Sequence, residues 1–237
     1  MRKGLEIGIT LGMVAVAVVL VVGRQERNTG AGVGPLSLDA PTMVAQTTTD
    51  LPPADTLAEW LRLGHNIGPD LPMVRIIEFG NFTCGFCLQF AASIDTVQRR
   101  YPGLVGVTWL HFVFDSQLVR PNSTTFLANA SECLAAQGLF GAFYRAVMLD
   151  GATLESRREI VAWAEARSAT DRFTAIACLE SRGGMPRVLA HARQGAKAGT
   201  NATPTWYLNG KRFIGAVPTV VLDSLVRDAM RSANEAG

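Results

Sequence analysis

Apolar positions after residue 55 follow two kinds of pattern, and their order predicts an α/β fold. Two continuous apolar runs, 73–79 and 104–114, have the form of strands that are buried on both faces. Between them, residues 84–100 place apolar side chains on one helical face, and Pro102-Gly103 ends the helix. Residues 73–114 therefore predict a β-α-β crossover unit with parallel strands.

The segments after the second strand predict a block of helices and then a hairpin. Ser123 is the expected cap of the first helix in this block, whose helical patterns cover 123–137, 139–149, 155–167, 171–181 and 185–198. Asn209-Gly210 is typical of a two-residue hairpin turn, so it predicts paired strands at 204–209 and 212–214. Pro218 begins a closing helix, and Thr56 caps a short amphipathic helix at 56–63.

The first 55 residues have a different pattern. Residues 7–22 form an uncharged apolar run of 16 residues that follows Arg2 and Lys3. We interpret 1–24 as an uncleaved signal anchor rather than a removed signal peptide, because no small-x-small cleavage site stands next to the run. The basic residues before the run predict that the rest of the chain is exported. Residues 25–55, rich in Gly, Thr, Pro and Ala, predict a flexible linker before a folded domain at 56–237.

Composition limits the function classes. The 237-residue chain has 22 basic and 20 acidic side chains, and a net charge of +2 gives no electrostatic case for binding nucleic acid. The mean hydropathy of +0.19 is high for a soluble domain, and the apolar run at 7–22 accounts for part of it. The histidines His65, His111 and His191 are far apart in the sequence, and His111 is expected to be a hydrogen-bonded core residue.

Cys84-Gly-Phe-Cys87 places two cysteines where the first predicted strand passes into its helix. A cysteine at a helix N-terminus faces unpaired N–H groups, which stabilise a thiolate, and a second cysteine three positions later can close a disulfide with it. Half of a four-ligand zinc site has the same spacing. Here, however, Cys133 follows Cys87 by about 45 residues, Cys178 follows Cys133 by about 45 more, and neither has a second possible ligand close to it in the sequence. The pattern therefore favours thiol–disulfide exchange, and no metal is expected.

Two segments together resemble the DsbA-like thiol–disulfide oxidoreductases: EFGNFTCGFC at 78–87 and GTNATPTWYLNG at 199–210. The resemblance covers about 60–235 and implies a thioredoxin-like fold with an all-helical insertion at about 118–198. It also implies a cis bond between Thr203 and Pro204 that faces the active-site disulfide, with the backbone of Thr203 pairing with a bound substrate. The residues alone would favour an ordinary trans proline at the start of a strand.

Glu78 lies six positions before Cys84, near the end of the first buried strand. The resemblance implies that this acid assists proton transfer at Cys87. A carboxyl group buried in an apolar strand has a raised pKa and can exchange a proton near neutral pH. The alternative is a glutamate at the strand end that reaches solvent.

Cys133 and Cys178 fall on two helices of the predicted insertion. Some DsbA-like proteins have a second, structural disulfide, and an exported chain favours a bond here. Such a bond would close a loop of about 46 residues, worth about 4 kcal/mol in the chain-entropy model. Two buried free thiols are the alternative.

The function that these features favour is a membrane-anchored, extracytoplasmic oxidoreductase that introduces disulfides into exported proteins with free thiols. It would use no cofactor beyond its redox-active disulfide, act as a monomer and exchange electrons with a membrane redox partner. Gly-Phe between Cys84 and Cys87 replaces the Pro-His of the strongly oxidising members, so an isomerase or reductase is an alternative. A holdase that binds unfolded chains in the groove at Pro204, and a structural metal domain, are two more.

Overall fold

The computed structural model describes residues 46–48, 52–118, 122–167 and 171–236. The predicted anchor at 1–24 lies outside these residues. Within the described part of the chain, we find no helix with the length and apolar character needed to cross a membrane.

The described strands form one mixed sheet in the order β1-β6-β5-β3-β4-β2. Its centre is the predicted crossover: strands β3 (Val74–Gly80) and β4 (Val105–His111) are parallel and joined by helix α2 (Gly85–Arg100). All the other pairs are antiparallel, and they add β5 (Thr205–Leu208), β6 (Lys211–Ile214), β1 (Gln46–Thr48) and β2 (His65–Ile67). Asn209 and Gly210 both have positive φ, as a two-residue hairpin turn between β5 and β6 requires.

Side chains of β3 alternate between two apolar layers, because successive residues of a strand point to opposite faces. Ile76 packs with α2 and the C-terminal helix α9 (Thr219–Ala236). Ile77 and Phe79 pack on the other face against Trp60 of helix α1 (Ala54–Leu63). Glu78 belongs to the same face as Ile76, which is the face that α2 covers.

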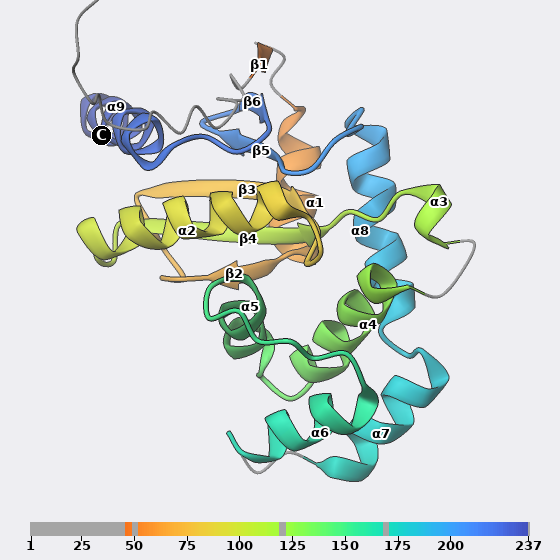
Figure 1. Cartoon of the computed structure of the whole chain (residues 1–237). Helices are drawn as coiled ribbons and strands as arrows, with labels where there is room; N and C mark the ends of the chain where they lie inside the picture. The colour runs from red at the N-terminus through yellow and green to blue at the C-terminus, as the bar shows by residue number, and fades with distance from the viewer. Residues whose placement is uncertain (1–45, 49–51, 119–121, 168–170, 237) are drawn as a thin grey trace, which may run out of the picture. The chain divides into compact units, whose positions relative to one another are not determined.

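The predicted helical insertion is present and comes next to the edge strand β2 (Figure 1). Its large core joins apolar side chains of the insertion to Trp109 of β4 and Cys87 of α2. The helices are α3 (Asp115–Leu118), α4 (Ser123–Ala135), α5 (Phe140–Met148), α6 (Arg157–Glu165), α7 (Arg172–Ser181) and α8 (Met185–Lys197).

Several boundaries differ from the predictions for physical reasons. Asn122, not Ser123, caps α4, since its side chain accepts a hydrogen bond from the backbone N–H of Thr125. Helix α1 begins at Ala54, directly after Pro53 and two residues before the predicted cap Thr56. The predicted linker at 25–55 also contains strand β1, which pairs with β6. Edge strands of three residues, such as β1 and β2, are too short to show an alternating pattern in the sequence.

Candidate functional site

Cys84 and Cys87 stand at the N-terminus of α2, as predicted, and they lie in different environments. Cys84 is the residue that caps α2 and is half-buried, whereas Cys87 is fully buried one turn into the helix. A hydrogen bond from the Cys87 thiol is the largest cause that lowers the pKa of Cys84 to about 5, and contacts with Thr203 and the backbone N–H groups of α2 also lower it against the effect of burial. Burial is the main cause that raises the pKa of Cys87 far above its ordinary value. The first sulfur is therefore a stable thiolate, while the second stays a thiol.

The segment around Pro204 meets the cysteines. The peptide bond between Thr203 and Pro204 is cis. The Sγ atom of Cys84 lies 3.3 Å from the backbone oxygen of Thr203, to which it can donate a hydrogen bond only in its thiol form. Cys84 and Thr203, which are 119 positions apart in the sequence, thus belong to one site. Thr203 is partly exposed to solvent.

Glu78 is completely buried in β3, so the alternative of a strand-end glutamate that reaches solvent is wrong. Its register partners in the neighbouring strands are Trp109 and Trp206. Both of its carboxyl oxygens are buried without a hydrogen-bond partner among the described residues. Burial, and secondarily the charge of Cys84, raise the pKa of Glu78 well above its usual range.

A pocket of about 720 Å³ adjoins the Cys84 segment on the side of the insertion. Phe82, Thr83 and Leu88 form its wall on the thioredoxin side, and residues of α4 and the 151–155 loop form the other wall. The lining is mainly apolar, so the pocket can take an apolar side chain close to Cys84.

Cys133 and Cys178 form a disulfide that joins α4 to α7, with their Cα atoms 5.7 Å apart. This bond lies within the insertion.

Sequence reasoning missed a buried polar cluster, because its members come from four distant elements. Oε1 of Glu132 lies 2.8 Å from Nε2 of His65, 3.0 Å from Nε2 of His111 and 3.8 Å from Nδ1 of His191. Arg187 lies 3.4 Å from Oε2 of the same carboxylate and donates to the Leu63 carbonyl. Burial alone would raise the pKa of Glu132, but hydrogen bonds from His111 and His65 outweigh it and lower the pKa.

Hydrogen bonds assign the ring protons in this cluster. The indole N–H of Trp109 donates to Nδ1 of His111, so the His111 proton is on Nε2 and points at the Glu132 carboxylate. The backbone N–H of His111 donates to Nδ1 of His191, whose Nε2 donates to Leu63. His65, His111 and Glu132 carry nitrogen and oxygen atoms of the kind that bind a divalent metal. The proton on Nε2 of His111 points at the Glu132 carboxylate, however, as in a group of side chains held together by hydrogen bonds.

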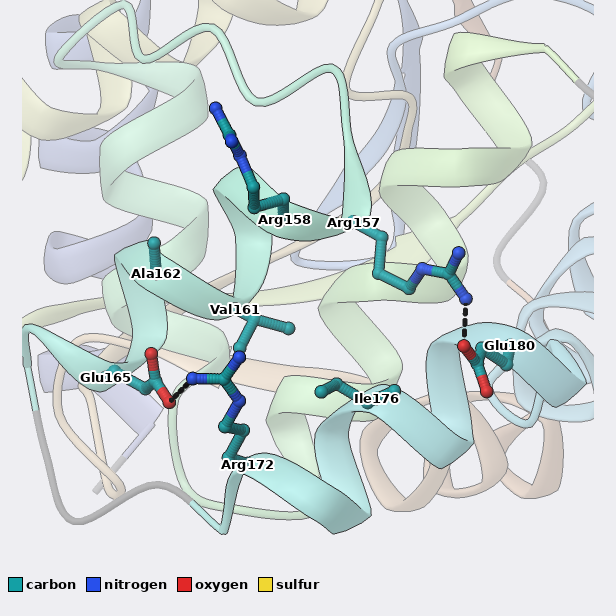
Figure 2. Close-up of a pocket in the computed structure, with 8 residues that line it drawn as sticks. All are labelled: Arg157, Arg158, Val161, Ala162, Glu165, Arg172, Ile176 and Glu180. Carbon is teal, nitrogen blue, oxygen red and sulfur yellow. Dashed lines mark hydrogen bonds and ion pairs between the residues drawn. The ribbon is translucent and has the colours of Figure 1, made fainter.

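A second pocket, of about 380 Å³, lies between α6 and α7 and contains none of the predicted site residues. Figure 2 shows that its arginines are partly paired: Arg157 pairs with Glu180, and Arg172 with Glu165 at 3.3 Å. Two of the three arginines that line it are in ion pairs with glutamates of the same lining, and we assign it no function.

The fold and the paired cysteines define the class of protein: a thioredoxin-like thiol–disulfide oxidoreductase with a helical insertion. A sequence model described as "Thioredoxin" matches residues 63–228. The chain therefore belongs to the thioredoxin family.

Solved structures share this fold at low identity. BdbD from Bacillus subtilis is 18% identical with a TM-score of 0.61, covering 72% of this chain and 95% of that one. The catalytic domain of Proteus mirabilis ScsC is 17% identical with a TM-score of 0.57, covering 75% and 98%. The thiol–disulfide exchange protein α-DsbA2 from Wolbachia pipientis is 14% identical with a TM-score of 0.58, covering 73% and 94%.

The curated relatives are longer proteins. One is "Na(+)/H(+) antiporter NhaA 1" of Mycolicibacterium gilvum, 30% identical over 148 residues, which are 62% of this chain and 23% of that protein. Another is "Na(+)/H(+) antiporter NhaA" of Herminiimonas arsenicoxydans, 26% identical over 191 residues, covering 78% and 29%. The matched part of this chain thus spans about a quarter of their length.

Proposed function

We propose that the protein is an extracytoplasmic thiol–disulfide oxidoreductase that introduces disulfides into exported proteins through Cys84 and Cys87. The observation that carries this proposal is the opposite shift of the two thiol pKa values. A stabilised Cys84 thiolate favours the reduced form of the pair, and a pair whose reduced form is favoured is a strong oxidant.

The reaction begins with the Cys84–Cys87 disulfide. A substrate thiolate attacks Sγ of Cys84, the bond between the two cysteines breaks, and Cys87 leaves with the electron pair and takes the proton of Glu78. A second substrate thiolate then attacks the substrate sulfur of the mixed disulfide and releases Cys84 as a thiolate. The substrate gains a disulfide and loses two electrons, which the Cys84–Cys87 pair accepts.

Binding in this proposal uses the Thr203–Pro204 segment. The partly exposed backbone of Thr203 would pair with an extended substrate, and its carbonyl oxygen, 3.3 Å from Sγ of Cys84, places that backbone next to the reacting sulfur. The apolar pocket beside Thr83 would take a neighbouring substrate side chain. Pairing through the backbone is tolerant of sequence, as an oxidase with many substrates needs.

The cellular setting is also part of the proposal. The apolar run at 7–22 would anchor a monomer to the membrane with its thioredoxin domain outside the cytoplasm, and the Cys133–Cys178 disulfide agrees with an oxidising compartment. A membrane redox partner would reoxidise the pair, and no bound cofactor or metal is needed because electrons pass between sulfur atoms. The proposal does not include ion exchange, because the match covers only 23% of the length of the first antiporter relative.

The deciding experiment is the reduction potential of Cys84–Cys87, measured by equilibration with glutathione buffers. We expect a value well above that of thioredoxin, toward about −120 mV, and a value near about −270 mV would overturn the oxidase in favour of a reductase. Cys84→Ser should abolish oxidation of a reduced substrate. If Cys84→Ser replaces the wild-type protein in cells without loss, the protein acts as a holdase that binds unfolded chains in the groove at Pro204 instead.

A further inference from the structure

Tyr144 is a buried tyrosine of the helical insertion that lies close to the buried acid of the thioredoxin sheet. It belongs to α5 and is only 3% exposed. Its ring packs edge-on against Trp109, with 5.2 Å between ring centroids, and lies 6.4 Å from Phe82, two positions before Cys84. Tyr144 and Cys87 belong to the same buried cluster.

The Trp109 ring also reaches Glu78. A Cβ placed on Gly80 would lie 3.0 Å from Oε1 of Glu78 and 2.3 Å from the ring edge of Trp109. The carboxyl group and the indole therefore meet above Gly80, which has no side chain in the way. Among the described residues, no lysine, arginine or histidine pairs with Glu78.

Three buried polar atoms stand here without partners among the described residues: the two carboxyl oxygens of Glu78 and the hydroxyl of Tyr144. Buried polar groups in folded proteins are nearly always hydrogen-bonded, often through one ordered water that joins two or more of them. Burial raises the pKa of Tyr144, and the charges of Glu78 and Cys87 raise it further, so this hydroxyl keeps its proton and interacts with both groups. A protonated phenol is a hydrogen-bond donor.

We propose that Tyr144 is a positioning residue for the proton that passes between Glu78 and Cys87, its hydroxyl donating toward the Glu78 carboxylate across one bridging water. This inference rests on the proposed exchange reaction. When Cys87 leaves the disulfide it takes the proton of Glu78, and an unpaired carboxylate remains in an apolar site. A hydrogen bond from Tyr144 stabilises that carboxylate, so the insertion sets the pH range in which Glu78 gives up its proton.

The test is the pKa of Glu78 in the full-length protein with reduced cysteines, followed by ¹³C NMR of labelled glutamate carboxyl groups. Glu78→Gln identifies the resonance. Tyr144→Phe keeps the ring and its packing against Trp109 but removes the hydroxyl, so we expect the pKa of Glu78 to rise by about one unit. Tyr207→Phe is the matched control, since Tyr207 is also buried but packs against Trp60 in the apolar layer on the other face of the sheet. An unchanged Glu78 titration in Tyr144→Phe would overturn the proposal.

A kinetic readout links this pKa to the reaction. The rate at which a substrate thiol opens the Cys84–Cys87 disulfide, measured by stopped-flow fluorescence, should show its inflection about one pH unit higher in Tyr144→Phe than in Tyr207→Phe or the wild type.

If the NMR shift occurs but no variant exchanges disulfides, the proposed function fails while the Tyr144–Glu78 link stands. If Tyr144→Phe does not fold, 3-fluorotyrosine incorporation decides. Its more acidic hydroxyls should lower the pKa of Glu78, and this shift should remain in a Tyr207→Phe background. An unchanged Glu78 titration in the fluorinated protein would refute the link.

Discussion

Removing the Cys133–Cys178 disulfide should destabilise the protein by about 4 kcal/mol while leaving thiol exchange intact. The bond joins residues 45 positions apart. Closing a loop of that length lowers the entropy of the unfolded chain by about 13 cal/mol/K, which is about 4 kcal/mol at room temperature. Replacing the buried Cys133 sulfur adds a smaller packing loss. The variant to make is Cys133→Ala with Cys178→Ala, which leaves no unpaired thiol in the insertion.

The assay is equilibrium unfolding in guanidinium chloride, followed by circular dichroism and by tryptophan fluorescence. Circular dichroism reports the helices, and the tryptophans that give the fluorescence lie in α1, β4, α6 and β5. Transitions that do not coincide would show that part of the protein unfolds separately. The control is the reduction potential of Cys84–Cys87, which should be the same in the variant and the wild type. A loss below about 1 kcal/mol with an unchanged denaturant slope would refute the loop-entropy reasoning.

Other predictions concern charge. Alkylation of Cys84 by iodoacetamide should have its midpoint near pH 5, following the pKa of about 5, and a midpoint above about 8 would contradict the thiolate assignment. Because the pKa of Cys84 is lowered on folding, the reduced protein should lose thermal stability relative to Cys84→Ser as the pH falls from about 9 to 5. A gain in thermal stability over the same pH range would mean that folding raises this pKa instead. Glu132→Gln should cost about 3 kcal/mol at pH 7, and the difference should shrink below about pH 4, where the carboxylate takes up protons in the unfolded chain while the folded one, with its lowered pKa, stays charged. Added Zn²⁺ should leave the melting temperature unchanged if the Glu132 cluster is hydrogen-bonded, whereas a rise that His65→Ala removes would identify it as a metal site.

The central elements could be predicted from the sequence because local patterns determine them. Continuous apolar runs identify β3 and β4, and the helical period between them identifies α2. The cysteine pair could be placed at the start of α2 because it follows the first run directly. Strand β1 could not be predicted, because three residues that pair through their backbone with β6 carry no side-chain pattern.

Contacts between side chains of distant elements could not be predicted from the sequence. Glu132 could not be connected with His65, His111 and His191 before the fold brought α4, β2, β4 and α8 together. Its only sequence signal was a glutamate in a helix that is otherwise mostly apolar, Ala or Ser, and that signal does not name partners. The burial of Glu78 was predictable from its strand, but the packing of Tyr144 against Trp109 was not, since α5 could have packed in other ways.

The insertion therefore has a chemical role beyond covering the site. A carboxylic acid between Trp109 and Trp206, with no cation in the described structure to pair with it, is held in its neutral form by burial. Such an acid can donate a proton to Cys87 readily, but afterwards it must exist as a carboxylate in the same apolar place. The register neighbours of Glu78 are both tryptophans, and their indole N–H groups donate elsewhere, to Nδ1 of His111 and to the Gly215 carbonyl. The donor that we propose is the Tyr144 hydroxyl of α5, which is buried without a hydrogen-bond partner among the described residues. On this proposal, the balance between the two protonation states of Glu78 depends on how the insertion is docked. The Glu132 cluster, which ties α4 to β2, β4 and α8, adds polar contacts to the apolar core that joins the insertion to the sheet.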